Sequence, residues 1–222
     1  MHFLLNKGGL YKVYNGNLLY HGCVPLKEDG NLKSVRIFGR AYKGKGLYEV
    51  LESYVRKGFY AMDPKEKERG KDIMWYIWLS ENSPLFGKDK MATFERYFLA
   101  EKETHKEKKN PYYLLLEDEK VVGKILKEFG LENEDAHIIN GHVPVKCKDG
   151  ENPVKCGGKV LVIDGGFSKA YQKETGIAGY TLIYNSYGLI LAAHKPFEST
   201  EAAIEKESDI HSDSTVVKRT LE

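Results

Sequence analysis

Residues 11–20 read YKVYNGNLLY, and this stretch fixes the local fold of the first part of the chain. Two short segments rich in tyrosine, valine and leucine flank Asn15 and Gly16, and an Asn-Gly pair between such segments is the strongest short signal for a β-hairpin. The second segment runs directly into residues 20–25, YHGCVP. The glycine allows a sharp turn and the proline prevents the strand from continuing in a central ladder, so we expect His21 to lie where the strand ends.

The same arrangement recurs in residues 138–144, IINGHVP. A short apolar run ends in a glycine, His142 follows it, and a proline comes two residues later. A neutral imidazole on a rigid strand end has a favourable geometry for a metal ligand. The pattern therefore predicts that His21 and His142 meet at one sheet edge and bind metal. Taken singly, each histidine is more often structural than a metal ligand, and the parallel between the two turns leaves both interpretations open.

The composition narrows the class of protein. The 222 residues are 41% hydrophobic, which is enough for a sizeable core in one domain or one large piece of a domain. The net charge of +2, from 34 basic and 32 acidic side chains, gives no general case for nucleic acid or an anionic membrane as a partner. Three cysteines cannot form a closed disulfide set, so we expect a reduced, cytoplasmic setting. No apolar stretch approaches the length of a membrane span, and the start lacks a signal-peptide pattern.

The periodicity of apolar residues predicts an α/β protein. Helical spacing covers 46–60, 66–79, 93–99 and 119–129, and strands are expected at 136–139, 159–163, 180–184 and 189–194. The last two strands form a hairpin across 185–188. We expect residues 136–194 to make a mostly antiparallel sheet section, packed by the helices before it.

Both ends of the chain break off inside a pattern. Residues 1–5 resemble the last turn of a helix, and residues 214–222 stop within an amphipathic run. The chain is therefore expected to be a segment of something larger.

Longer stretches carry a family resemblance. Together with residues 13–25, they are 82–91 (NSPLFGKDKM), 93–98 (TFERYF), 109–113 (KNPYY), 140–146 (NGHVPVK), 162–171 (VIDGGFSKAY) and 175–188 (TGIAGYTLIYNSYG). In these stretches the chain resembles the carboxy-terminal part of the class III fructose-1,6-bisphosphatases, a branch of the calcineurin-like metallophosphatases. The resemblance covers most of residues 1–198. It implies a partial metallophosphatase domain over 1–198, the carboxy-terminal part of a calcineurin-like β-sandwich flanked by helices, followed by a truncated helical tail over 199–222.

The resemblance also implies a chemistry. Such enzymes hold two divalent ions, usually Mn²⁺ in this family, that activate a water for attack on a phosphomonoester. By resemblance, His21 and His142 are the two later histidine ligands. The family's Asp-x-His, Gly-Asp-x-x-Asp-Arg and Gly-Asn-His motifs are absent from these 222 residues. The implied dinuclear site is therefore incomplete in this chain, which would need a missing amino-terminal half as its partner. A homo-oligomer is a further expectation.

Four basic residues are candidates for binding a sugar phosphate. Lys88, Lys90 and Arg96 lie close together in sequence, and an ammonium acts on phosphate as a point charge while a guanidinium offers a two-pronged fork. A solvated basic loop is the alternative reading of that segment. Lys169 follows two glycines that let the backbone approach a ligand.

Three functions are compared. The first is hydrolysis of fructose 1,6-bisphosphate in gluconeogenesis by the complete enzyme, and the second is an inactive truncated fragment. The third, a nucleic-acid module, is disfavoured because the lysines of residues 101–108 are interleaved with glutamates.

Overall fold

The computed structural model describes residues 1–196, 199–205 and 212–219. Contacts between residues divide the chain into two compact units, the first spanning Met1–Ile138 and the second Ile139–Glu222. This division differs from the expected boundary at residue 198. None of the helices in the described ranges has both the length and the apolar character needed to cross a membrane.

The described part of the chain contains helices, short 3-10 turns and strands in mixed order. The α-helices are α1 (His2–Lys7), α2 (Gly44–Tyr60), α3 (Pro64–Leu79), α4 (Thr93–Phe98), α5 (Glu119–Glu128), α6 (Lys169–Thr175) and α7 (Thr200–Glu205). The 3-10 turns are η1 (Lys102–His105), η2 (Pro111–Leu114), η3 (Cys147–Asp149) and η4 (Cys156–Gly158). The strands are β1 (Tyr11–Tyr14), β2 (Asn17–Tyr20), β3 (Val35–Ile37), β4 (Arg40–Tyr42), β5 (Ile138–Asn140), β6 (Val154–Lys155), β7 (Val160–Val162), β8 (Gly179–Asn185), β9 (Gly188–His194) and β10 (Ser212–Arg219).

The predicted hairpin at the start of the chain is confirmed. β1 and β2 pair antiparallel across Asn15 and Gly16, whose φ angles of 49° and 73° are both positive, as a two-residue hairpin turn requires. The amide of Leu18 on β2 also donates to the carbonyl of His137 (2.8 Å), just before β5. This bond ties the hairpin to a residue far along the chain within the same unit.

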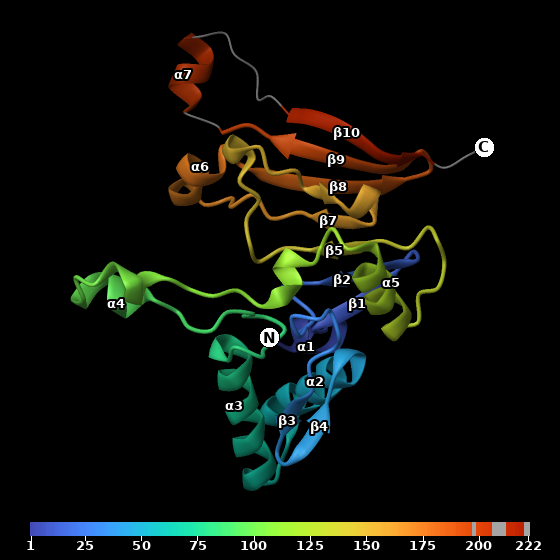
Figure 1. Cartoon of the computed structure of the whole chain (residues 1–222), viewed down its shortest axis with the longest axis vertical. Coiled ribbons are helices and arrows are strands. Elements are labelled where there is room, and N and C mark those ends of the chain that lie inside the picture. Colours follow the sequence, from blue (N-terminus) through green and yellow to red (C-terminus); the bar gives the residue numbers. More distant parts are fainter. Residues whose placement is uncertain (197–198, 206–211, 220–222) are drawn as a thin grey trace. The chain divides into compact units, whose positions relative to one another are not determined.

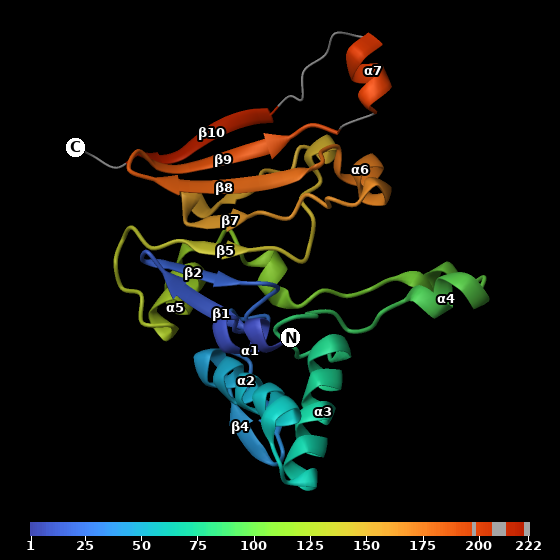
Figure 2. The ribbon, with the colours of Figure 1, turned by 180° about the vertical axis from the view of Figure 1, so that it is seen from behind.

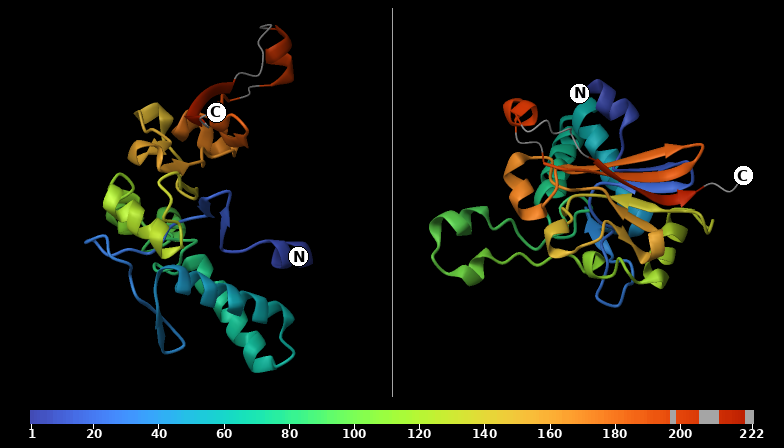
Figure 3. Two further views of the ribbon diagram at one scale, coloured as in Figure 1. Left: turned by 90° about the vertical axis from the view of Figure 1, so that its right-hand side faces the viewer. Right: turned by 90° about the horizontal axis from the view of Figure 1, so that it is seen from above.

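Helices α2 and α3 of the first unit pack against each other (Figure 1). They lie side by side in both views of Figure 3 and approach closely because Gly58 faces Gly70, where a Cβ on Gly70 would lie 2.2 Å from the Gly58 nitrogen. Asp63 caps α3 by accepting from the Lys65 amide (3.2 Å), and Pro64 occupies the first helical position. A buried cluster joins both helices to β3; its members are Val35, Ile37, Leu47, Leu51, Ile73 and Ile77.

Helix α5 begins and ends where the sequence indicates. Asp118 accepts from two backbone amides at its start, and the chain leaves the helix at Gly130 with a φ of 81°. Its buried face consists of Val121, Val122, Ile125 and Leu126.

The second unit is rich in antiparallel strands, as predicted for residues 136–194. β8 pairs with β9 across the expected hairpin turn, and β6 pairs with β7. Figure 2 shows β10 beside β9, with which it also pairs antiparallel. The packing of this section by the preceding helices stays a prediction, as does the calcineurin-like β-sandwich.

The helical tail expected over 199–222 is correct only for α7. Residues 212–219 form the strand β10 instead. Thr215 and Val216 are β-branched and pair with Leu191 and Ile190 of β9, and such residues pack well on a pleated surface. The expected tail also included 206–211 and 220–222, which lie outside the described residues.

Candidate functional site

His21 is exposed on a turn that the first unit holds rigidly. It follows β2 directly, and the amide of Cys23 donates to the carbonyl of Pro84 (2.8 Å). A Cβ on Gly22 would lie 2.4 Å from that same carbonyl oxygen. The glycine is therefore required by a close approach of two backbone segments, as well as by the turn itself.

Three buried tyrosines hold the two sides of this turn, and we call Tyr20, Tyr48 and Tyr112 the tyrosine clamp. The Tyr20 and Tyr112 hydroxyls lie 2.7 Å apart, and the Tyr48 hydroxyl donates to the carbonyl of Cys23 (2.9 Å). Burial, reinforced by the neighbouring ionisable groups, raises the pKa of Tyr20 and Tyr48 well above the usual value. The clamp is thus neutral, and it holds the residues on both sides of His21.

Burial also raises the pKa of the Cys23 thiol to about 12, although a hydrogen bond with Tyr113 opposes the shift. A thiol with this pKa stays protonated at neutral pH, whereas a cysteine that acts as a nucleophile or metal ligand must be a thiolate. Cys23 therefore contributes packing next to His21 rather than chemistry.

His142 lies in the second unit on a tight turn. Its φ of 68° puts it in the left-handed region, which few residues other than glycine adopt. The amide of Val143 donates to the carbonyl of Gly141 (2.8 Å), and the amide of Val145 donates to that of Asp164 (2.8 Å). The turn predicted after β5 is therefore present, although the unusual backbone angle belongs to the histidine and not to the glycine.

The two histidines belong to different units, so their meeting at one sheet edge stays a prediction. Among the residues with described positions, no three histidine, cysteine, aspartate or glutamate side chains gather in a way that would hold a metal ion. The described residues alone do not fit a dinuclear metal centre.

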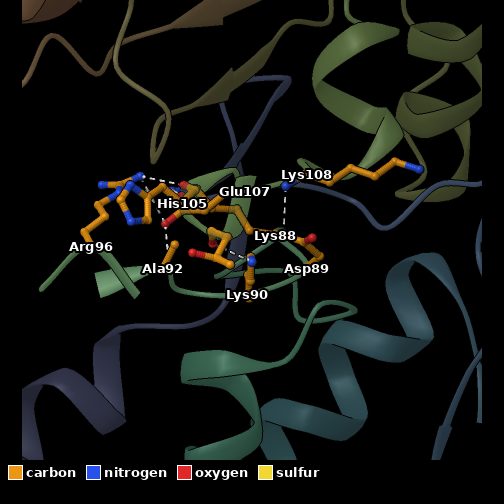
Figure 4. Close-up of polar contacts among 9 residues, drawn as sticks. Lys88, Asp89, Lys90, Ala92, Arg96, His105, Glu107 and Lys108 are labelled. Atoms are coloured by element: carbon orange, nitrogen blue, oxygen red, sulfur yellow. Dashed lines mark hydrogen bonds and ion pairs between the residues drawn. The ribbon is translucent and has the colours of Figure 1, made fainter. Parts of the chain in front are cut away.

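Lys88, Lys90 and Arg96 all belong to one projecting segment, residues 88–109, which we call the arm (Figure 1). Figure 4 shows Lys88 and Arg96 converging on Glu107, with Nζ and Nη2 at 3.0 Å and 3.7 Å from its carboxylate oxygens. The amide of Ala92 donates to the same carboxylate (3.0 Å). Partial burial raises the pKa of Glu107, but the Ala92 bond and the two cations outweigh it and lower the pKa overall.

Lys90, the third candidate residue on the arm, also has an internal partner. Lys90 Nζ donates to the carbonyl of Thr104 (2.7 Å), and the His105 ring nitrogen Nε2 lies 2.9 Å from the carbonyl of Leu99. These bonds give Lys88, Lys90 and Arg96 a structural role in closing the arm. Their role in phosphate binding stays a prediction, since a phosphate would have to compete with Glu107.

Lys169 is the first residue of α6, in the second unit, and its side chain is exposed. The preceding turn is formed by Gly166, with a φ of 68°, whose amide donates to the Asp164 carboxylate (2.9 Å). The glycines therefore serve a turn here, and contact of Lys169 with a phosphate stays a prediction.

Two kinds of residue at the site are not indicated by the sequence. Glu107 belongs to the run of interleaved lysines and glutamates at 101–108, whose composition is typical of a solvated loop, although its side chain is only 17% exposed. Tyr48 and Tyr112, which are completely buried, gave no signal beyond their place in apolar patterns. In both cases the partners are distant in sequence, and local patterns do not contain them.

Comparison with known proteins identifies the family. The family model described as Firmicute fructose-1,6-bisphosphatase matches residues 1–222. A protein named fructose-1,6-bisphosphatase class 3 from Clostridioides difficile (strain 630) is 59% identical over 217 residues, which are 97% of this chain and 33% of that protein. The protein of the same name from Clostridium botulinum (strain Hall) is 58% identical over 97% of this chain and 32% of its own length. No solved structure matches the chain. The chain belongs to the Firmicute fructose-1,6-bisphosphatase family and spans about a third of the length of these curated relatives.

Proposed function

We propose that this chain is one part of a fructose-1,6-bisphosphatase, which hydrolyses fructose 1,6-bisphosphate to fructose 6-phosphate and phosphate. The observation that carries the proposal is the family match over all 222 residues, together with the identity of 55–59% to relatives of that name. A role in gluconeogenesis and a cytoplasmic location accompany this activity.

The contribution of this chain would be the pair His21 and His142, as two ligands of a dinuclear manganese site. The exposed imidazole of His21 on a turn held by the tyrosine clamp supports this role, because a ligand that is fixed before binding loses little freedom on binding. Two imidazoles cannot bridge two hard cations, which need carboxylate ligands. The rest of the ligand set would come from the part of the family protein that this chain does not span.

The sugar phosphate would be bound by basic residues, and Lys169 is the candidate that lies outside the arm. Its side chain is exposed, whereas Lys88 and Arg96 already neutralise Glu107. We propose Lys169 as a direct phosphate contact. Lys88, Lys90 and Arg96 would contribute mainly by shaping the arm and its positive field.

The test is phosphate release from fructose 1,6-bisphosphate with added Mn²⁺. The purified chain alone should release none, whereas co-expression with the unmatched part of the Clostridioides difficile relative should restore turnover. His21→Ala and His142→Ala should each abolish the restored activity, while Lys12→Ala, on the exposed hairpin, should leave it unchanged.

Two results would contradict this assignment. Turnover by the lone chain that disappears in His142→Ala would mean that the catalytic centre lies within these residues. Failure of every complementation with soluble, co-purifying partners would favour the alternative, a non-catalytic remnant of the enzyme.

A further inference from the structure

The end of the arm carries an exposed apolar surface, which we call the aromatic tip. It consists of Met91, Phe94, Tyr97, Phe98 and Leu99, on and beside α4. The three aromatic side chains are 72%, 80% and 79% exposed in sequence order, and the other two are 45% and 44% exposed. The rings of Phe94 and Phe98 stack with their centroids 6.4 Å apart and an interplanar angle of 13°.

The aromatic tip does not stabilise the arm itself. Helix α4 has six residues and none of them is buried. The arm is closed instead by polar contacts, namely the Glu107 carboxylate with Lys88, the Lys90 ammonium with Thr104, and the His105 ring. A helix this short is not stable through its own hydrogen bonds, and Phe94, Tyr97 and Phe98 bury little of their surface. These three aromatic side chains therefore contribute little to holding the arm together.

The size of the surface suits a specific contact. With about 200 Å² for each aromatic side chain, the three rings expose roughly 450 Å². The largest continuous apolar patch of a typical monomeric protein exposes about 300–600 Å², and a patch of this size is often functional. Two such tips facing each other would bury about 900 Å² from the rings alone, and Met91 and Leu99 bring the total above the roughly 1,000 Å² that a specific interface needs.

We propose that the aromatic tip is a dimerisation surface that pairs with the same tip of a second copy of this chain. In a dimer with two-fold symmetry, the same surface patch of each copy forms the interface, so the apolar centre of one tip faces the apolar centre of the other. The charged residues next to the tip carry both signs, with Glu95 on α4 and Lys102, Glu103 and Lys106 around η1. A rotated copy can therefore bring opposite charges together around the apolar centre, which orients the contact. The proposal does not depend on the proposed catalytic function.

The experiment is sedimentation equilibrium of the purified chain over a wide range of concentration. The unchanged chain should sediment as a dimer. In a triple variant with Phe94→Ser, Tyr97→Ser and Phe98→Ser, the dissociation constant of the dimer should be roughly tenfold higher or more. The matched control is Trp75→Ser with Trp78→Ser, since both tryptophans are 60% exposed on α3 of the same unit. That variant should still dimerise.

A second variant keeps the test independent of folding defects. Tyr97→Cys changes one side chain of the tip that is 80% exposed, and under oxidation it should give a disulfide-linked dimer more readily than the unchanged chain with its native cysteines. A monomeric unchanged chain, or a dimer that survives in the triple variant, would overturn the proposal. So would a tip that becomes covered only when the remainder of a family protein is co-expressed.

Discussion

Removal of either the Tyr20 or the Tyr112 hydroxyl from the tyrosine clamp should destabilise the first unit more than removal of both. Tyr20 and Tyr112 are 6% and 0% exposed, and their hydroxyls are 2.7 Å apart. Tyr20→Phe leaves the Tyr112 hydroxyl buried and unpaired, which costs about 1–3 kcal/mol, and Tyr112→Phe does the same to its partner. The double variant removes both groups and should lose only the net value of a hydrogen bond, about 0.5–1.5 kcal/mol.

The measurement is equilibrium unfolding in urea followed by tryptophan fluorescence. The chain has two tryptophans, Trp75 and Trp78, which lie in the first unit with their rings 5.3 Å apart. The signal therefore reports the unit that contains the clamp. A double-mutant cycle then gives the coupling energy between the two hydroxyls, and we expect it to exceed about 1 kcal/mol.

The reasoning would be refuted if the cost of the double variant equalled the sum of the single costs. That result would mean that each hydroxyl is satisfied without the other. Tyr14→Phe is the control, because this residue is 60% exposed and its hydroxyl removal should change the free energy of unfolding by less than about 0.5 kcal/mol.

Three further results are expected. Gly22→Ala should destabilise the first unit by about 1–3 kcal/mol in the same urea assay, because its Cβ would lie 2.4 Å from the Pro84 oxygen, whereas Gly46→Ala in α2, with open space around it, should be neutral or stabilising. A thiol reagent at neutral pH should label the two half-exposed cysteines well before Cys23, as mass spectrometry would show; fast labelling of Cys23 would contradict its burial. The lowered pKa of Glu107 stabilises the arm above the usual carboxyl pKa of about 4.3, and this stabilisation is lost as the pH falls through the lowered value. Glu107→Gln should therefore speed proteolysis of the arm at neutral pH but make little difference in acid.

Local chemistry predicted many of the elements in advance. The Asn-Gly turn of the first hairpin and the end of α5 at Gly130 are set by a few neighbouring residues, whereas α3 begins at Pro64, two residues before the expected start at 66. The β3–β4 hairpin was missed because Phe38, and not an asparagine or glycine, occupies a turn position with a φ of 44°. A bulky residue in that conformation depends on surrounding contacts, which a local pattern does not show.

The sequence predicts the parts of the candidate site that depend on neighbouring residues, but not the contacts between side chains that are distant in sequence. The sequence indicated a histidine at the end of β2, and His21 is there, exposed on a turn. It did not indicate that Lys88 and Arg96 share Glu107, because this carboxylate lies 19 and 11 positions further along the chain. A run of alternating charges has the composition of a solvated loop, and only the fold distinguishes the one carboxylate that is largely buried.

The base of the arm and the turn that carries His21 are held by the same residues. The Asn110 side chain accepts from the amides of Leu26 and Tyr112 (3.1 and 3.0 Å), and the Tyr112 hydroxyl pairs with that of Tyr20, the residue before His21. A displacement of the arm at its base would therefore act both on the clamp, through Tyr112, and on Leu26. Because both contacts are buried, breaking either one leaves unpaired polar groups, so the arm and the turn should move together or not at all.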